Sequence, residues 1–193
     1  MDNKFFTFIK PYLSYIDNGH FFRKPFSWLY SLMAIINLIV PFYILYQAAD
    51  NNNIFLTDPI IVVVFLLNWI IIAIVSWISF QLWWDRKSKV ISTSIEGDDF
   101  VAIPVIAHLI QTIGEWLGTW IGIVGFWVAL ITRIFLWDEV PYYFRQLDLE
   151  FMGKGFLSVI LMPICGFLII VTTRFFAELY RVLASIANNT RKN

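Results

Sequence analysis

The sequence has little charge and few of the residues that carry chemistry. Only 15% of its 193 residues are charged, 59% are hydrophobic, and the formal net charge is zero. A soluble domain carries about a quarter charged residues, so this composition indicates a polytopic membrane protein. Zero net charge provides no overall field that attracts nucleic acid, and we expect no nucleic-acid partner.

Motifs for metals, nucleotides and cofactors are also missing. His20 and His108 form no H-x-x-x-H or H-E-x-x-H pattern, and the lone Cys165 can form neither an internal disulfide nor a C-x-x-C pair. No segment has a strand pattern that a phosphate-binding loop could follow. Asp98-Asp99, before an apolar segment, is typical of helix N-termini. We therefore predict a protein that is not an enzyme and holds no cofactor or metal.

What the sequence does contain is four long apolar segments. They predict an all-α polytopic membrane protein, with transmembrane helices over about residues 28–49, 59–84, 114–137 and 155–173. Asp58-Pro59 is typical of a helix start. The last helix is expected to continue as a cytoplasmic extension to about residue 188, so that residues 25–193 form one transmembrane domain.

The N-terminal segment, residues 1–24, has no apolar core or cleavage site of a signal peptide. Its apolar residues gather on one side of a helical wheel, which predicts an amphipathic helix in the headgroup plane. Packing on a soluble partner is the alternative. Pro11 would interrupt this helix unless a new one begins there.

The third apolar segment, Phe100 to Trp137, is too long for one straight span that starts at the membrane edge. Its 38 residues would reach roughly 57 Å at about 1.5 Å per residue, against a hydrocarbon core of about 30 Å. We expect an interfacial helix over residues 100–113 and a span from residue 114. A re-entrant first half is the alternative.

Lysine and arginine are concentrated before the first span, at residues 86–89 and after the fourth span. By the positive-inside rule, both termini and the loop near residues 85–100 are predicted to be cytoplasmic.

Two asparagines lie near mid-depth of the first two spans. A hydrogen bond between helices contributes about 0.6–2 kcal/mol there, so Asn37 and Asn68 are predicted to join the first two helices. Ion coordination is the alternative interpretation.

A polar stripe follows the third segment. His108, Gln111 and Glu115 fall on one side of a helix, and Arg133 continues that side. We expect a structural ion pair or an interface site, with transport or proton handling as the alternative. Arg174 of the last helix should lie at the depth of Glu115, so we predict that it reaches Glu115, Glu178 or both.

Beside the stripe runs a face of small residues with the spacing G-x-x-x-G-x-x-x-G. It comprises Gly114, Gly118, Gly122 and Gly125. This spacing lets two helices approach closely. The partner could be a neighbouring span or another copy of the chain.

The tail PICGFLIIVTTRFFAELYRVLASIANNT resembles the end of a bacterial family of small membrane proteins of unknown function. Arg174, Glu178 and Asn188 match the family's Arg-x-x-x-Glu helix with an asparagine near its end, whereas Pro163 lies further upstream than in that pattern. The resemblance covers about 30 residues and has no counterpart for the first three spans. It implies a bacterial cytoplasmic membrane protein and carries no assigned activity.

These observations favour a non-enzymatic accessory or scaffold subunit of a membrane protein complex. Its partners would be the lipid bilayer and other membrane subunits or further copies of the chain, bound through the glycine face and the aromatic surface. The alternative is a small oligomeric channel or transporter that uses His108, Glu115 and Arg133.

Overall fold

The computed structural model describes residues 9–17, 20–50, 54–92, 102–136 and 156–192. Within these ranges all regular structure is helical and there are no strands. Four helices are long and apolar enough to cross a membrane, which confirms the all-α prediction with four candidate spans.

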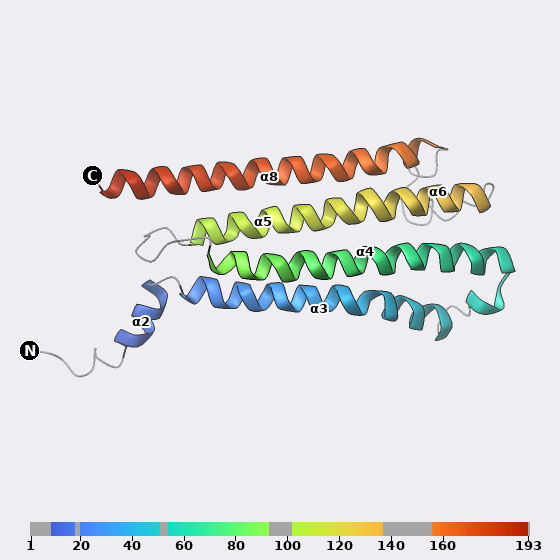
Figure 1. Cartoon of the computed structure of the whole chain (residues 1–193), viewed down its shortest axis with the longest axis horizontal. Helices are drawn as coiled ribbons and strands as arrows, with labels where there is room; N and C mark the ends of the chain where they lie inside the picture. Colours follow the sequence, from blue (N-terminus) through green and yellow to red (C-terminus); the bar gives the residue numbers. More distant parts are fainter. Residues whose placement is uncertain (1–8, 18–19, 51–53, 93–101, 137–155, 193) are drawn as a thin grey trace, which may run out of the picture.

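The long helices run side by side, and α2 lies at the same end of the bundle as the last turns of α8 (Figure 1). In chain order the elements are α2 (Lys10–Asp17), α3 (His20–Asp50), η1 (Ile54–Leu56), α4 (Pro59–Ile91), α5 (Ala102–Thr119), η2 (Trp120–Val124), α6 (Gly125–Phe135) and α8 (Leu157–Lys192). Of the two η elements, η1 is a 3-10 turn and η2 is a π-helical turn.

The starts of α2 and α4 follow from local sequence. Asp58 caps α4, because its side chain accepts a hydrogen bond of 2.8 Å from the backbone N–H of Ile60. Pro59 occupies the first turn, where a missing N–H leaves no hydrogen bond unmade. A helix also begins at Lys10, which places Pro11 in its first turn. The rest of the predicted N-terminal helix, residues 1–8 and 18–19, lies outside the described residues.

The third long helix differs from the prediction. It continues without a break from Ala102 to Phe135, and α5 and α6 form one rod through η2 (Figure 1). Neither a change of direction near residues 113–114 nor a re-entrant first half is present. The physical reason is that α8 has 36 residues and packs along α5, η2 and α6. A helix that is supported over its whole length has no cause to bend.

The glycine face packs against α8 of the same chain, so the partner is a neighbouring span. A Cβ added at Gly118 would lie 2.5 Å from the backbone oxygen of Gly166, and one at Gly166 would lie 2.5 Å from that of Gly118. The other glycines of the face lie against Thr173 (Gly114), Gly166 and Pro163 (Gly122) and Met162 (Gly125). Because α8 covers this face, it cannot be the surface that receives another protein.

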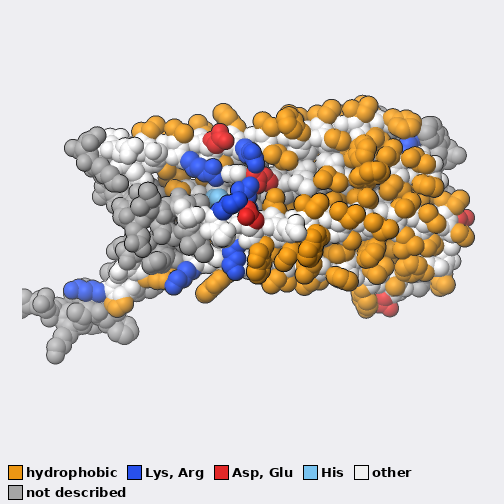
Figure 2. Space-filling model, viewed as in Figure 1, with side chains coloured by type: hydrophobic (Ala, Val, Ile, Leu, Met, Phe, Trp, Pro, Cys, Tyr) orange, Lys and Arg blue, Asp and Glu red, His pale blue; other side chains and the backbone are white. Residues whose placement is uncertain are grey.

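The core at the end of the bundle near α2 joins three helices. Tyr30 and Ala34 of α3, Trp83 and Val90 of α4 and Val105 of α5 form one buried cluster. On the face shown in Figure 2, charged side chains gather in a band toward that same end, and the surface beyond the band is largely apolar.

Candidate functional site

Glu115 lies at the centre of the charged band. Its side chain is 7% exposed. Oε2 accepts a hydrogen bond of 2.8 Å from Arg86 Nη2, and Oε1 accepts bonds of 3.0 and 2.7 Å from Arg174 Nε and Nη2. Gln111 Nε2 donates a further bond of 2.8 Å to Oε1. A buried carboxylate is tolerated when it is paired and hydrogen-bonded in this way.

The network extends along α8 through a second arginine. Arg181 Nη2 donates a bond of 2.5 Å to Oε1 of Gln111. We call Arg86, Gln111, Glu115, Arg174 and Arg181 the charged network. It ties α4, α5 and α8 together at one level.

The predicted pair between Arg174 and Glu115 is therefore present. Glu178 is exposed on α8, and Arg174 turns to Glu115 rather than to it. Arg86 and Arg181 belong to the network although sequence reasoning did not assign them to it. Arg86 follows the Trp83-Trp84 pair in a basic run, a pattern that indicates the membrane edge and gives no direction for the side chain.

His108 belongs to a buried unit next to the network. The hydroxyl of Tyr30 lies 2.8 Å from His108 Nδ1 and 3.3 Å from Thr112 Oγ1. Thr112 donates its only hydroxyl proton to the carbonyl of His108. Toward Tyr30, the Thr112 oxygen can therefore act only as an acceptor. The Tyr30 hydroxyl has one proton, which it can donate to Thr112 Oγ1 or, over the shorter distance, to His108 Nδ1. This histidine is a satisfied member of the helix packing.

Arg133 is not part of the same site. It follows Glu115 by 18 residues, about 27 Å along a helix, and lies near the opposite end of the rod. The π-helical turn η2 intervenes and rotates later residues away from the face that a regular 100° step predicts. The tight glycine contacts with α8 also fill the space between the two ends. The predicted single stripe is therefore divided.

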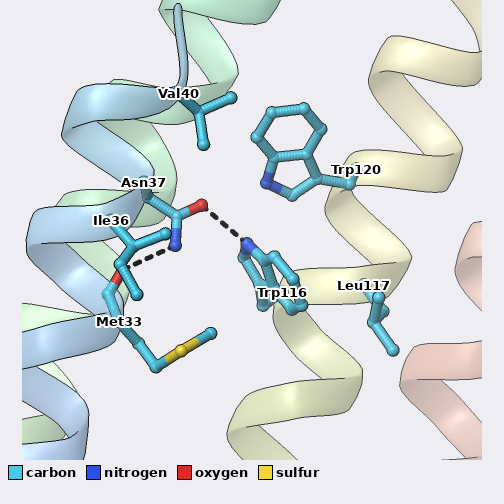
Figure 3. A pocket seen from close by; sticks show the side chains of 7 residues that line it. All are labelled: Met33, Ile36, Asn37, Val40, Trp116, Leu117 and Trp120. Carbon is cyan, nitrogen blue, oxygen red and sulfur yellow. Dashed lines mark hydrogen bonds between the residues drawn. The ribbon is translucent and has the colours of Figure 1, made fainter. Parts of the chain in front are cut away.

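Asn37 makes an inter-helix hydrogen bond, but to the third helix instead of the second. Its Oδ1 accepts a bond of 2.9 Å from Trp116 Nε1, and its Nδ2 donates one of 2.7 Å to the Met33 carbonyl (Figure 3). Asn68 donates to the Val64 carbonyl of its own helix. Within the described part of the chain its buried Oδ1 has no partner. The prediction that both asparagines join the first two helices is wrong, because helix rotation directs each side chain elsewhere.

The Asn37–Trp116 bond lies beside an apolar cavity between α3 and the third long helix (Figure 3). The cavity has a volume of about 430 Å³ and is lined by Met33, Ile36, Asn37, Val40, Trp116, Leu117 and Trp120. Trp120 Nε1 donates to Ser79 Oγ of α4 at 2.8 Å. Both indole N–H groups are thus satisfied, and the cavity presents apolar surface.

Among the described residues, no three His, Cys, Asp or Glu side chains are grouped closely enough to hold a metal ion. The lone Cys165 is exposed on α8. The charged network can hold helices together and can offer guanidinium donors to an anion. In the part of the chain that the structure describes, the network offers no free carboxylate for proton transfer, because Glu115 is already held by two arginines.

No family model matches the chain, and comparisons with curated proteins and with solved structures give no match. The resemblance of the tail to a bacterial membrane family therefore stays a prediction.

Proposed function

We propose that this chain is a non-enzymatic accessory or scaffold subunit of a bacterial membrane protein complex. In this proposal it spans the cytoplasmic membrane four times, has both termini in the cytoplasm and contacts a partner subunit through the cytoplasmic part of its bundle. The observation that carries the proposal is an apolar surface beyond the charged network.

The charged network marks a level in the bundle. Glu115 precedes Phe135, the last residue of α6, by 20 residues, and Arg174 follows Leu157, the first residue of α8, by 17 residues. These spacings correspond to about 30 and 26 Å of helix, close to a hydrocarbon thickness of about 30 Å. If the far ends of these helices lie at the outer surface, the charged network lies at the cytoplasmic boundary.

All four long helices continue past that level, since Tyr30 of α3, Val90 of α4 and Val105 of α5 form a buried cluster there. We call residues 102–114 and 175–192 the α5–α8 extension; its longer arm, on α8, reaches about 27 Å beyond Arg174 at 1.5 Å per residue. Its exposed large apolar side chains are Ile106, Ile113, Phe175, Phe176, Leu179, Tyr180, Val182, Leu183 and Ile186. An apolar surface of this kind outside the hydrocarbon core indicates an interaction site.

The occupant that fits this surface is a helical segment of another membrane protein. The extension is continuous with the transmembrane helices, so a partner helix that packs along α8 in the membrane can follow it into the cytoplasm. The glycine face is not available for this contact, because α8 itself covers it. The apolar side of α8 is available along its whole length.

Site-specific photo-crosslinking in intact cells tests the proposal. A photoreactive residue at Leu183 of the extension, 52% exposed, should give a defined protein adduct. The matched control is Phe42 of α3, 65% exposed and well inside the predicted hydrocarbon region, which should give lipid adducts only. Protein adducts at neither position, together with a clean monomer in several mild detergents, would contradict the proposal.

The channel or transporter hypothesis has less support. Glu115 is occupied by two guanidinium groups, and Arg133 lies at the other end of the rod. Proton or ion flux in proteoliposomes that is abolished by Glu115→Gln would overturn the accessory-subunit proposal in favour of transport.

A further inference from the structure

We propose that the charged network binds the phosphate group of an anionic phospholipid in the cytoplasmic leaflet. This inference goes beyond the proposed function: it depends on the level of the network in the membrane and not on any protein partner. Three features carry it, namely an excess of positive charge, guanidinium groups with exposed donors, and a position at headgroup depth.

The band around the network has more cations than carboxylates. Lys89 pairs with Asp85 at 2.6 Å on the surface of α4, which leaves Glu115 to face both Arg86 and Arg174. We count three further residues in the band: Lys87, which follows Arg86 on α4, Glu178, which lies one helical turn after Arg174 on α8, and Arg181. Arg181 bonds a neutral amide, that of Gln111. The described band therefore has five cations for three carboxylates, and an additional anion would be attracted to it.

The arginines retain donors for that anion. A guanidinium group has five N–H donors in a planar fork. Arg174 directs Nε and Nη2 to one oxygen of Glu115, and its side chain is 52% exposed. Arg86 reaches the other oxygen through Nη2 alone. Since Glu115 fixes these groups from the buried side, their outer edges present donors to the surface of the bundle. The planar fork matches the geometry of a phosphate group as well as that of a carboxylate.

The depth of the band favours a lipid over a soluble phosphate. Trp84, an exposed aromatic residue, carries Lys87 over its ring at 4.8 Å from the centroid. Tryptophan with adjacent basic residues is typical of the headgroup level. The helix lengths on the far side of the network independently place it about 26–30 Å from the outer ends. A lipid phosphate is held at this depth by the bilayer itself.

Native mass spectrometry of the full-length protein in mild detergent tests the inference. Phosphatidylglycerol and phosphatidylcholine are titrated separately, and we expect phosphatidylglycerol to bind more tightly. Arg181→Gln removes a cation whose only described bond is to a neutral amide, so this variant should fold. It is expected to weaken phosphatidylglycerol binding about tenfold, and Arg174→Gln at least as much. Arg174→Lys keeps the charge without the fork and should give an intermediate loss.

Lys24→Gln is the matched control, because it removes one positive charge at the same end of the bundle but outside the network. It should leave phosphatidylglycerol binding within about twofold of the wild-type value. Equal affinity for the two lipids would overturn the inference. So would equal losses in Lys24→Gln and Arg181→Gln, which would indicate unspecific attraction. Competition by millimolar inorganic phosphate that displaces the lipid completely would assign the site to a soluble anion and also overturn it.

Discussion

Replacing Glu115 by glutamine should destabilise the bundle. More of the lost free energy of unfolding should come from the contact with Arg86 than from the contact with Arg174. Arg86 and Arg174 reach different oxygens of the carboxylate. Glutamine keeps one acceptor oxygen and turns an NH2 group toward the other guanidinium. The Arg86 side chain is 21% exposed, whereas that of Arg174 is 52% exposed and more strongly screened by solvent.

The magnitude follows from these exposures. A hydrogen bond to a charged group contributes about 1.5–3 kcal/mol, and a solvent-exposed ion pair about 0.2–1 kcal/mol. We therefore expect Glu115→Gln to lower the free energy of unfolding by about 2–4 kcal/mol. In double-mutant cycles, the coupling of Glu115 with Arg86 should be about 1.5–3 kcal/mol and that with Arg174 about 0.5–1 kcal/mol.

The assay is reversible unfolding in mixed micelles of mild detergent and dodecyl sulfate, followed by tryptophan fluorescence. Arg86→Gln, Arg174→Gln and Glu115→Gln are measured alone and in pairs. The exposed pair of Lys89 and Asp85 supplies the reference cycle, with a coupling of at most about 0.5 kcal/mol. Additive effects for Glu115 with both arginines would show that neither contact exists, and a larger coupling for Arg174 than for Arg86 would refute the reasoning from exposure.

Three further predictions concern packing inside the bundle. Gly166→Ala should lower the free energy of unfolding by about 1–3 kcal/mol, because its Cβ would lie 2.5 Å from the backbone oxygen of Gly118 and 2.7 Å from backbone atoms of Gly122. Gly122→Ala, whose nearest neighbours lie 3.7 and 3.9 Å away, is the control and should be near neutral. Equal effects in the same unfolding assay would show that α8 does not lie on the glycine face. Asn37→Leu should lower the free energy of unfolding by about 0.6–1.7 kcal/mol, because it removes an inter-helix hydrogen bond. Asn68→Leu should leave that free energy unchanged or raise it, because it removes a buried oxygen without a described partner. A larger loss of stability in Asn68→Leu than in Asn37→Leu would contradict both assignments. Tyr30→Phe should lower the free energy of unfolding by about 1–2 kcal/mol, since it removes the hydroxyl that lies within hydrogen-bonding distance of His108 and Thr112. An unchanged unfolding curve would show that these contacts do not stabilise the bundle.

The network has a consequence for how the bundle is held together. In lipid, apolar side chains gain little by meeting each other, so close backbone contact and polar links between helices determine the packing. Here the close contact is the approach of α8 to Gly118 through Gly166, and the polar links are Glu115 with its arginines and Asn37 with Trp116. Together they join all four long helices.

The prediction that Arg174 of the last helix reaches Glu115 of the third was correct, and it rested on their equal depth in the bundle. Counting residues from the ends of two spans places Arg174 and Glu115 at the same level, and a buried carboxylate at that level needs a cation. Arg86 was missed because a basic run after Trp83-Trp84 also has a sufficient explanation as a membrane-edge signal. The bend that we expected at residues 113–114 is absent for a different reason. Segment length restricts how much helix the hydrocarbon can hold, but it does not require the excess to bend.

The sequence by itself determined the all-helical class, the four long apolar helices, the cap at Asp58 and the position of the charged band along the chain. These are properties of composition and of short-range periodicity, which each segment has on its own. Only the tertiary structure decided that α8 covers the glycine face, that Asn37 meets Trp116, that Arg86 and Arg181 join the network and that Arg133 does not. Each of these depends on which helices are neighbours and on how far each is rotated about its axis. That rotation is set by the fit of side chains distant in sequence, and a single π-helical turn is enough to change it.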